Sequence, residues 1–318
     1  MSAGGTRCEP ADPARPTVHA VTVNWNKYDD TLACVRSLLK SAYPLTRILV
    51  LDNGSTDGSG DRLERELARS GVAFLRNREN EGFARGMNAC LRDAVASGAD
   101  LVFVVNNDTE VDPGCVGRLV EGLTADPEAA VAGPAIFFHA QPDKVWQSGG
   151  SFSFWRAGLA VPGKGRRAGD LPKRAERVSY LTWCAVLVAR RALDRVGYLD
   201  PSYYFYVEDV DFALRVRETG MRMVFVPGAR VWHKIGSVAR DRTSPFVLYH
   251  LGRSWTLLFR KRFTFPYAWY GIALQYLLYT PHRLWQMLRG GAAWESYAAW
   301  FSGLRDGCGA REPRRLSP

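Results

Sequence analysis

Short apolar runs alternate with amphipathic stretches in the first part of the chain. The runs have the length of buried strands, and they are Val18–Trp25, Arg47–Leu51, Val72–Arg76 and Leu101–Val105. The stretches between them predict helices, through the helical spacing of Leu32, Val35, Leu38 and Leu39 and over Gly58–Ser70 and Gly82–Ser97. Strands that alternate with helices predict βαβ units, so the expected fold class is α/β with a mostly parallel central sheet.

Polar side chains close three of the predicted strands. They are the amides and carboxylates of Asn24 and Asn26, Asp52 and Asn53, and Asn106, Asn107 and Asp108. Asn and Asp are common turn formers, which is sufficient to explain any one of these clusters. Three clusters at successive strand ends favour a binding site, because ligands of open α/β sheets lie outside the carboxyl ends of the strands.

Motifs and composition exclude some functions. A P-loop is excluded because no GxxxxGK(S/T) pattern occurs, and a dinucleotide site lacks its GxGxxG fingerprint after the first strand. Apolar residues make up 47%, which is typical of a globular protein, and the net charge of +10 favours an anionic partner such as a nucleotide diphosphate, an anionic lipid or a nucleic acid. The six cysteines form no CxxC pair, so neither a zinc cage nor a disulfide framework is predicted, and a reducing cytoplasm is expected.

Three segments lack a periodic pattern. Residues 1–16 contain no apolar h-region, so a disordered lead-in is expected rather than a secretory signal, and residues 311–318 are expected to be a disordered end. Residues 151–176 are rich in Gly, Arg and Pro and predict a mobile loop. Such a basic loop either covers an anionic substrate or is a solvated part of the surface, and both interpretations stay open.

A cluster of acids follows an aromatic run. Residues 203–206 are all aromatic and lead into a predicted helix whose first turn carries Glu208, Asp209 and Asp211. Acids there complement the helix dipole, and Asp211 can pair with Arg215 one turn on. Alternatively, one carboxylate points into a cleft as a general base, beside aromatic rings on which sugars stack. The residues alone do not decide between the two.

A candidate metal ligand lies further along the chain. Strands are predicted over Tyr180–Ala189, Met223–Val226 and, after a Pro227–Gly228 turn, Val231–His233. A lone histidine is more often a structural residue than a ligand. If Asp108 approaches His233 across the sheet edge, however, the pair can hold Mn²⁺ or Mg²⁺ beside a diphosphate.

The last part of the chain predicts an aromatic-rich helical tail. No charged residue occurs over Phe263–Pro281, and Arg260, Lys261 and Arg262 precede this stretch. Its prolines, Gln and Gly favour an amphipathic element at a membrane interface over a spanning helix, with aromatic anchors at the headgroups and cations on the phosphates. The other interpretation is a helical cap packed on the rest of the protein.

Taken in order, several sequence pieces resemble one enzyme family. They are NWN, DNGSTDGS, NEGFARGMN, VVNNDTEV, FYVEDVDFALR and VPGARVWHKIGS, and they resemble the inverting glycosyltransferases of family 2, in the rhamnosyltransferase-like and galactofuranosyltransferase-like branch. The resemblance covers about Val18 to Ser237, and GRSWTLLFRKRF and AWFSGLRDG resemble the tail segments of such enzymes. It implies a GT-A fold, a nucleotide-binding αβα sandwich, over residues 17–244. The helical tail is expected over residues 245–310, at a membrane interface or as a cap packed on the rest of the protein.

The resemblance implies a nucleotide-sugar side of the site. In the family, an Asn after the first strand and an acid after the second hold the base and the ribose, and the NEGFARGMN turn lies against the nucleotide and its phosphates. The matching residues are Asn24, Asp52 and Asn53 at the strand ends, and Gly82, Arg85 and Asn88 in the turn. Asn107 is expected on this side as well.

The resemblance also implies a metal and a general base. The family's DxD motif is Asn106-Asn107-Asp108 here, so Asp108 is the strong metal ligand, with His233 where relatives supply a histidine for Mn²⁺ or Mg²⁺. The Asp of the family's ED pair is the base, which implies Asp209. The acceptor-side residues expected beside it are Glu208 and Trp183, although Trp183 fits a buried core equally well.

The expected activity is inverting transfer of a sugar from a nucleotide-diphosphate donor, dTDP-rhamnose or a UDP-sugar, to a hydroxyl of a glycan or lipid-linked acceptor. The expected location is cytoplasmic and peripheral at the inner face of the cell membrane. The alternative is a catalytically inactive relative that binds carbohydrate or nucleotide, which the amide at Asn106 supports. Nucleic-acid binding is not expected, because no matching module is present.

Overall fold

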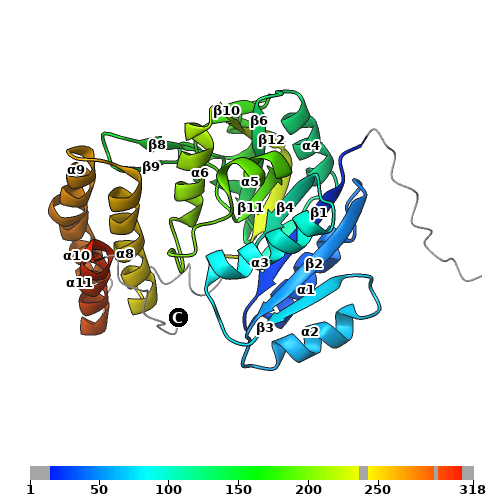
Figure 1. Cartoon of the computed structure of the whole chain (residues 1–318), viewed down its shortest axis with the longest axis horizontal. Helices are drawn as coiled ribbons and strands as arrows, with labels where there is room; N and C mark the ends of the chain where they lie inside the picture. The colour runs from blue at the N-terminus through cyan, green and yellow to red at the C-terminus, as the bar shows by residue number, and fades with distance from the viewer. Residues whose placement is uncertain (1–14, 236–242, 290–292, 310–318) are drawn as a thin grey trace, which may run out of the picture.

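One large mixed sheet organises the chain (Figure 1). The computed structural model describes residues 15–235, 243–289 and 293–309. The elements of its first part are β1 (Val18–Asn24), α1 (Tyr28–Leu38), β2 (Leu45–Asn53), α2 (Ser59–Leu67), β3 (Ala73–Asn77), α3 (Phe83–Ala96), β4 (Leu101–Val105), β5 (Thr109–Val111), α4 (Cys115–Thr124), β6 (Ala129–Phe138) and β7 (Gln141–Gln147).

The remaining elements complete the sheet and add helices at one end. They are β8 (Ser151–Ser153), β9 (Gly158–Ala160), η1 (Ala168–Asp170), β10 (Glu176–Val178), β11 (Ala185–Ala189), α5 (Arg190–Val196), α6 (Glu208–Glu218), β12 (Arg222–His233), α8 (Pro245–Arg262), α9 (Tyr267–Leu274), η2 (Gln275–Tyr279), α10 (Thr280–Arg289) and α11 (Trp294–Cys308). Of the expected disordered lead-in, residues 1–16, the first fourteen lie outside the described residues, as does the expected disordered end, residues 311–318.

The sheet has the order β10-β12-β6-β11-β4-β1-β2-β3, with β5 paired to β12 and β7 to β6. Strands β3, β2, β1 and β4 are parallel to one another, as are β6 and β12. Strand β11 lies between these two blocks and is antiparallel to both of its neighbours. The predicted α/β class with a mostly parallel central sheet is confirmed.

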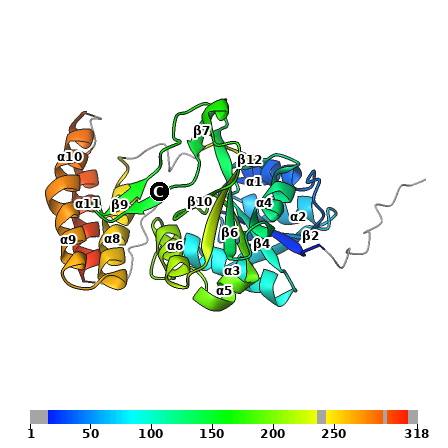
Figure 2. The same ribbon diagram turned by 90° about the horizontal axis from the view of Figure 1, so that it is seen from above.

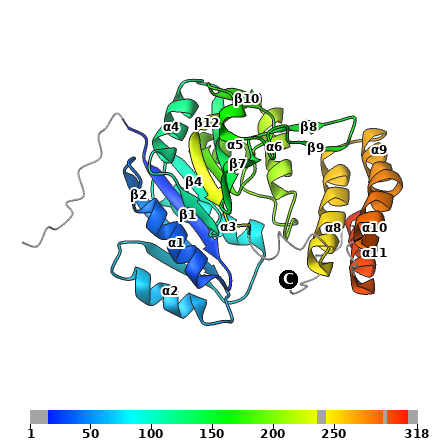
Figure 3. The same ribbon diagram turned by 180° about the vertical axis from the view of Figure 1, so that it is seen from behind.

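Helices cover both faces of the sheet, as the alternation of side chains along β2 shows. Leu49 and Leu51 belong to the core on the side of α3 and α6, whereas Ile48 and Val50 belong to the core on the side of α1, α2 and α4. A strand that is buried on both faces must be apolar at every position, which is why these strands are continuous apolar runs. The layers form an αβα sandwich (Figure 3).

The segment expected as a mobile loop carries defined elements. Residues 151–176 contain the hairpin β8–β9, helix η1 and the start of β10. The hairpin extends from the sheet to α9 (Figure 3). The hydroxyls of two tyrosines of α9 and one of η2 donate to three successive main-chain carbonyls of the hairpin. The pairs are Tyr267 with Phe154 (2.6 Å), Tyr270 with Trp155 (2.5 Å) and Tyr279 with Arg156 (2.7 Å). We name this contact the tyrosine–hairpin contact.

Strand β12 differs from the prediction of two short strands. It runs through the expected Pro227–Gly228 turn as one strand, and its pairing with β6 shifts register between Arg222 and Met223 and again between Val226 and Arg230. The turn residues form a bulge because β6 continues beside them on both sides. This continuity brings His233 to the far end of β12.

Helices α8 to α11, residues 245–289 and 293–309, form the C-terminal helical unit at one end of the molecule (Figure 2). Helices α8 and α11 approach closely at glycines: a Cβ on Gly303 would lie 2.2 Å from the Tyr249 carbonyl oxygen, and one on Gly307 would lie 2.6 Å from that of Arg253. Residues 257–259 of α8 also belong to the core on the α3 and α6 side of the sheet. Helix α8 therefore packs on both the sheet layers and α11.

No bilayer-spanning helix is found among the described residues, since each helix there is too short or too polar for that role.

The close approach of α8 and α11 at Gly303 predicts that a larger residue there lowers the free energy of unfolding. Ala is favoured over Gly in a helix by about 1 kcal/mol, but at Gly303 its Cβ would overlap a backbone oxygen. We expect Gly303→Ala to lower the free energy of unfolding by about 1–3 kcal/mol in denaturant titrations. Gly169→Ala is the control, because its Cβ meets open space. Equal or greater stability of Gly303→Ala would contradict the close packing of α8 and α11.

Candidate functional site

Asn24 and Asp52 lie opposite each other at the ends of β1 and β2. Asn24 is fully buried: its Nδ2 donates to Asp52 Oδ1 (2.8 Å), and its Oδ1 accepts from the Thr31 hydroxyl (2.7 Å). Asp52 also accepts from the Ser55 hydroxyl (2.5 Å) and lies 3.8 Å from Arg76 Nε. Asn24 therefore orients Asp52 from the buried side of the strand ends. The Asp52 carboxylate also contacts Ser55 and Arg76, which are partly exposed.

The turn before α3 brings Asn53 and Gly82 together. Asn53 Nδ2 donates to the Asn80 side chain (3.0 Å) and to the Gly82 carbonyl (3.2 Å). Gly82 has a φ of +84°, and a Cβ there would lie 2.6 Å from the Tyr204 ring, so both its conformation and its surroundings require glycine. The Phe83 N–H donates to the Tyr204 carbonyl (2.9 Å). The turn is thus held between the end of β2 and the aromatic run.

Two other predicted residues of α3 differ in their surroundings. Arg85 is exposed in the first turn of the helix. Asn88 is buried, and its amide donates to the Leu199 carbonyl (2.7 Å) and accepts from the Leu199 N–H (2.9 Å). Arg85 is therefore accessible to a ligand, whereas Asn88 joins α3 to the loop before α6.

Asp108 and His233 are neighbours although 125 residues separate them. Strands β5 and β12 pair with Thr109 opposite His233, which leaves an Asp108 carboxylate oxygen 3.1 Å from His233 Nε2. His233 is 4% exposed, and the Trp146 ring packs edge-on against it with the centroids 4.5 Å apart. Asn107, the residue before Asp108, donates to the Thr31 hydroxyl (2.8 Å), so it is linked to the hydrogen bonds around Asn24.

The Asp108–His233 pair fits a divalent cation that also binds a substrate. A carboxylate and an imidazole are both ligands of such metals, but within the described residues no group of three or more His, Cys, Asp or Glu side chains could hold a metal ion. Burial alone would lower the pKa of His233, but Cys184 and Asp108 outweigh it and raise that pKa to about 10, which indicates an environment that favours positive charge. A cation here would take its remaining ligands from a bound diphosphate.

The first turn of α6 holds two acids in different environments. Asp209 accepts hydrogen bonds on both oxygens, from the Tyr180 hydroxyl (2.7 Å) and the Val210 N–H (2.8 Å). Glu208 is 7% exposed, and its Oε2 has no hydrogen-bond partner in the part of the chain that the structure describes. Burial and the neighbouring Asp209 raise the pKa of Glu208 well above its ordinary value. Burial also raises the pKa of Asp209, but its hydrogen bonds oppose the rise, so Asp209 is the first of the pair to ionise.

A two-residue segment, Trp183 and Cys184, contacts both parts of the candidate site. The Asn106 N–H donates to the Cys184 carbonyl (2.8 Å), and the backbone of Trp183 hydrogen-bonds to Asp209. Burial raises the pKa of the Cys184 thiol, and the charges of Asp108 and Asp209 add to that rise, so both carboxylates are near it. The candidate metal ligand and the candidate base therefore lie near one short segment.

The Trp183 side chain is a buried core residue, which is one of the two positions expected for it; the other was on the acceptor side of the site. Its ring is 2% exposed and packs edge-on against Phe212 of α6, with the centroids 4.9 Å apart. The indole thus belongs to the core in this structure, while the backbone of the same residue contacts Asp209.

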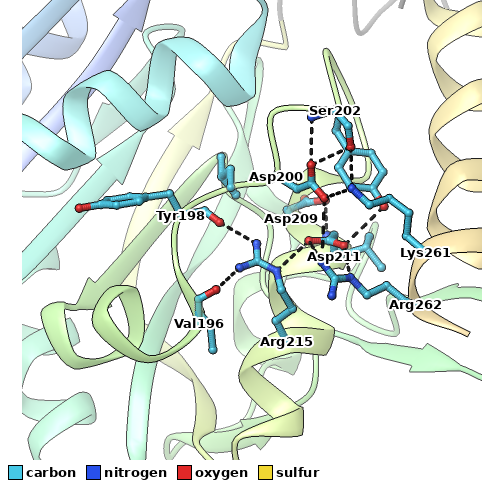
Figure 4. Close-up of polar contacts among 12 residues, drawn as sticks. Val196, Tyr198, Asp200, Ser202, Asp209, Asp211, Arg215, Lys261 and Arg262 are labelled. Carbon is cyan, nitrogen blue, oxygen red and sulfur yellow. Dashed lines mark hydrogen bonds and ion pairs between the residues drawn. The ribbon is translucent and has the colours of Figure 1, made fainter. Parts of the chain in front are cut away.

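Asp211 is fully buried and bonded by two arginines (Figure 4). The predicted pair with Arg215 is confirmed, with Nε 2.8 Å from Asp211 Oδ2. Arg215 also donates to the carbonyls of Val196 and Tyr198. Arg262 approaches Asp211 from α8, and its Nη2 lies 3.3 Å from Oδ2. A contact between α6 and the C-terminal helical unit therefore forms two residues after Asp209.

The three cations of the basic run before the aromatic stretch each have a partner within the protein, although Arg260 and Lys261 are exposed. Their predicted contact with lipid phosphates stays a prediction. Arg260 donates to the carbonyls of Gly307 and Cys308, Lys261 pairs with Asp200, and Arg262 pairs with Asp211. Buried or half-buried acids in the preceding loop and α6 attract two of these three side chains.

Three residues of the site have no distinct signal in the sequence. Tyr180 lies in an apolar segment and looks like a core aromatic, Thr31 is one polar residue on an amphipathic helix, and Arg262 belongs to a charged run. Each becomes important only through a partner far away in the chain: Asp209, Asn107 and Asp211, respectively.

Comparison with known proteins identifies related sequences. The family model described as Glycosyl transferase family 2 matches residues 20–197. N-acetylglucosaminyl-diphospho-decaprenol L-rhamnosyltransferase of Mycobacterium tuberculosis is 32% identical over 224 residues, which are 64% of this chain and 71% of that protein. Rhamnosyltransferase WbbL of Escherichia coli K12 is 34% identical over 83 residues, which are 25% of this chain and 31% of that protein. The expected rhamnosyltransferase-like resemblance is confirmed.

Solved structures share the fold. GalNAc-T7 with UDP, GalNAc and Mn²⁺ aligns over 76% of this chain and 48% of its own, with a TM-score of 0.61 and 19% identity. Mannosyltransferase PcManGT from Pyrobaculum calidifontis, with GDP-Man and Mn²⁺, aligns over 94% of this chain and 86% of its own, with a TM-score of 0.55 and 15% identity. These similarities confirm the expected GT-A fold.

The hydrogen bond from Tyr180 predicts a shift in the titration of Asp209. A donor that points at a carboxylate favours its charged form, so the Tyr180→Phe substitution should raise the pKa of Asp209 further above its ordinary value. Carboxyl ¹³C NMR titrations can measure this, with Asp209→Asn to assign the signal. Tyr43→Phe is the control, because the Tyr43 hydroxyl donates to Pro16 instead. An unchanged or lower pKa in Tyr180→Phe would rule out the contact.

Proposed function

The chain belongs to glycosyltransferase family 2, and we propose that it transfers a sugar, with inversion, from a nucleotide-diphosphate donor to a hydroxyl of a lipid-linked or glycan acceptor. The observation that carries this proposal is that the Asp108–His233 pair and Asp209 both lie near residues 183–184, whose backbone bonds to Asn106 and to Asp209. A displacement needs these two functions at opposite ends of the reacting bond, a diphosphate-binding group and a base.

The donor is proposed to lie along the carboxyl ends of β1, β2 and β4. Asp52 would hold the base and ribose, and the exposed Arg85 would contact the diphosphate, beside the Gly82 turn. Four asparagines would act by orienting these groups, since their amides already bond to protein partners, and they are Asn24, Asn53, Asn88 and Asn107. Rhamnosyl transfer by the Mycobacterium tuberculosis relative favours dTDP-rhamnose over a UDP-sugar as the donor.

Asp108 and His233 would hold a divalent cation, Mn²⁺ or Mg²⁺, for which the Mn²⁺ in both structural neighbours is supporting evidence. Such a cation supplies positive charge that stabilises a departing diphosphate. The raised pKa of His233 indicates that the protein already favours positive charge at this point.

Asp209 would act as the general base. A sugar hydroxyl is a weak nucleophile, and a carboxylate within hydrogen-bond reach removes its proton as the attack proceeds. Of the two acids, Asp209 ionises first and has both oxygens oriented by donors. Glu208 stays protonated longer, and its Oε2, which has no partner among the described residues, would contact the acceptor. The backbone of Trp183, rather than its buried ring, would contribute on this side.

Substitution of the base tests the proposal against its alternative, an inactive relative that only binds. With Mn²⁺, a nucleotide sugar and a lipid-linked GlcNAc acceptor, we expect Asp209→Asn to lose roughly 10²–10⁴-fold in turnover while its donor affinity stays unchanged. The exposed Asp143→Asn is the control. Product formation by NMR also reports the anomeric configuration. Wild-type protein that binds donors by calorimetry but yields no product across a donor panel would support the inactive relative.

A membrane surface is the proposed partner of the C-terminal helical unit and the hairpin. Large apolar side chains that are at least two-thirds exposed gather there among the described residues, and they are Trp155, Phe265, Trp269, Leu277, Leu288 and Trp294. The sequence has no Asp or Glu between Arg262 and Glu295, whereas Arg283 and Arg289 lie among the aromatic residues. Exposed aromatic rings with cations and without acids suit an anionic lipid interface. The lipid-linked acceptor of the relative supports this partner and a peripheral location at the inner face of the membrane.

Vesicle binding tests the membrane surface. We expect the protein to cosediment with vesicles that contain phosphatidylglycerol and the Trp155→Ser/Trp269→Ser variant to bind roughly tenfold or more weakly, because each burial of a large apolar side chain contributes about 1.5–3 kcal/mol. Leu39→Ser is the matched control, because Leu39 is an exposed apolar residue far from the unit, after α1. Equal losses in both variants, or no vesicle binding by the wild type, would count against a membrane surface.

A further inference from the structure

The loop that precedes α6 is held in an unfavourable backbone conformation. Tyr206 and Val207, the last two residues before the acids of α6, have φ values of +65° and +73°. Positive φ is rare for residues other than glycine, and for β-branched Val207 it is a strong outlier. Such residues each cost about 1–3 kcal/mol and persist only when their surroundings hold them.

Helix α8 supplies contacts along this loop. Arg253 is 1% exposed, and its Nη1 donates to the Ser202 carbonyl (2.8 Å). One residue further on, the hydroxyl of the fully buried Ser254 donates to the Phe205 carbonyl (3.2 Å). Two side chains of α8 thus bond to main-chain carbonyls of the loop. These bonds do not depend on which side chains the loop carries.

The last turn of α8 adds charge. Lys261 pairs with Asp200 at the start of the loop, and Arg262 pairs with Asp211 just beyond its end (Figure 4). Because Asp211 is fully buried, its carboxylate depends on Arg215 and Arg262 together for neutralisation. Helix α8 therefore contacts both ends of the loop that leads into Glu208 and Asp209 at the start of α6.

The same loop also touches the donor side. Tyr204 packs on Gly82, and its carbonyl accepts from Phe83 N–H (2.9 Å), while His250 of α8 stacks on the Tyr204 ring at 5.0 Å between centroids. Displacement of α8 would therefore release contacts near the proposed donor site and near the proposed base. Of these contacts, the ion pair of Arg262 with Asp211 is the one nearest in sequence to Asp209.

We propose that Arg262 is a positioning residue for the general base: its ion pair with Asp211 fixes the first turn of α6, so that transfer requires α8 packed beside the site. This inference rests on the proposed function, since it assigns Arg262 a role through Asp209. The C-terminal helical unit then has two roles, one at the lipid surface and one in orienting the carboxylate that activates the acceptor.

The charge of Arg262 matters as well as its packing. Without it, the buried Asp211 carboxylate keeps one cation instead of two, and the loss of that positive charge opposes ionisation of Glu208 and Asp209 in the same turn. The titratable groups around Asp209 are Glu208 beside it, Tyr180 from the segment after β10, Cys184 at the start of β11 and Asp211. Loss of Arg262 adds negative field to this group, so the acid limb of activity should move to higher pH.

Substitutions in the last turn of α8 test the inference in the full-length protein. We expect Arg262→Met to lower kcat roughly 10- to 100-fold by misplacing the base, with nucleoside-diphosphate affinity within twofold of wild type and the acid limb at higher pH. Arg262→Lys, which restores a cation, should recover most of the rate. Arg260→Met is the matched control, because Arg260 is on the same turn but, within residues 15–235, 243–289 and 293–309, bonds only to the end of α11. It should keep the wild-type kcat and pH profile.

Other outcomes separate the two proposals. Wild-type kcat and pH profile in Arg262→Met, with only a lower melting temperature, would overturn the positioning role, as would equal losses in Arg260→Met and Arg262→Met. If Arg262→Met does not fold, Ser254→Ala removes a single hydrogen bond to the loop and should still lower kcat with unchanged nucleoside-diphosphate affinity; an unchanged kcat there would overturn the role of α8. A wild-type protein that transfers no sugar would reject the proposed function instead.

Discussion

A carboxylate enclosed by protein has to be neutralised where it lies, and Asp211 meets this requirement with guanidinium groups from two helices. Arg215 comes from the same helix and follows from local sequence. Arg262 comes from α8, so the start of α6 keeps its geometry only when α8 is packed against it. Since Asp209 lies two residues before Asp211, one buried charge connects the proposed chemistry to the far end of the chain.

A second constraint is the strand register, which gathers residues from distant segments. The pairing of β5 with β12 sets Asp108 beside His233, and the residues at the start of β11 lie near both this pair and Asp209. Strand β11 can occupy that position because it runs antiparallel between two parallel blocks, which brings its first residues to the same edge as the carboxyl ends of β1, β2 and β4. The site is therefore a product of the sheet more than of any one loop.

The sequence predicted those features that depend on neighbouring residues. Strands buried on both faces are continuous apolar runs, so the α/β layers were evident, and the Asp211–Arg215 pair follows from a spacing of four on a helix. The sequence could not predict that Asp108 contacts His233, because this contact depends on β12 continuing through its bulge. The partner of Arg262 could not be predicted, because a basic run has the same composition whether it faces lipid phosphates or buried carboxylates. The prediction of a mobile loop over residues 151–176 was wrong because their composition is that of a loop. Their aromatic residues Phe152 and Phe154 nevertheless pack on Phe263 at the end of α8 and on Tyr267 of α9.

The tyrosine–hairpin contact has an evolutionary consequence. Tyr267, Tyr270 and Tyr279 bond to carbonyl oxygens of the hairpin, and every amino acid supplies that same oxygen. The side chains at the tip, Trp155 among them, can diverge without loss of the attachment. The surface that the tip presents to the proposed membrane partner can thus change by exchange of a few side chains, while the hairpin stays attached to α9 and η2.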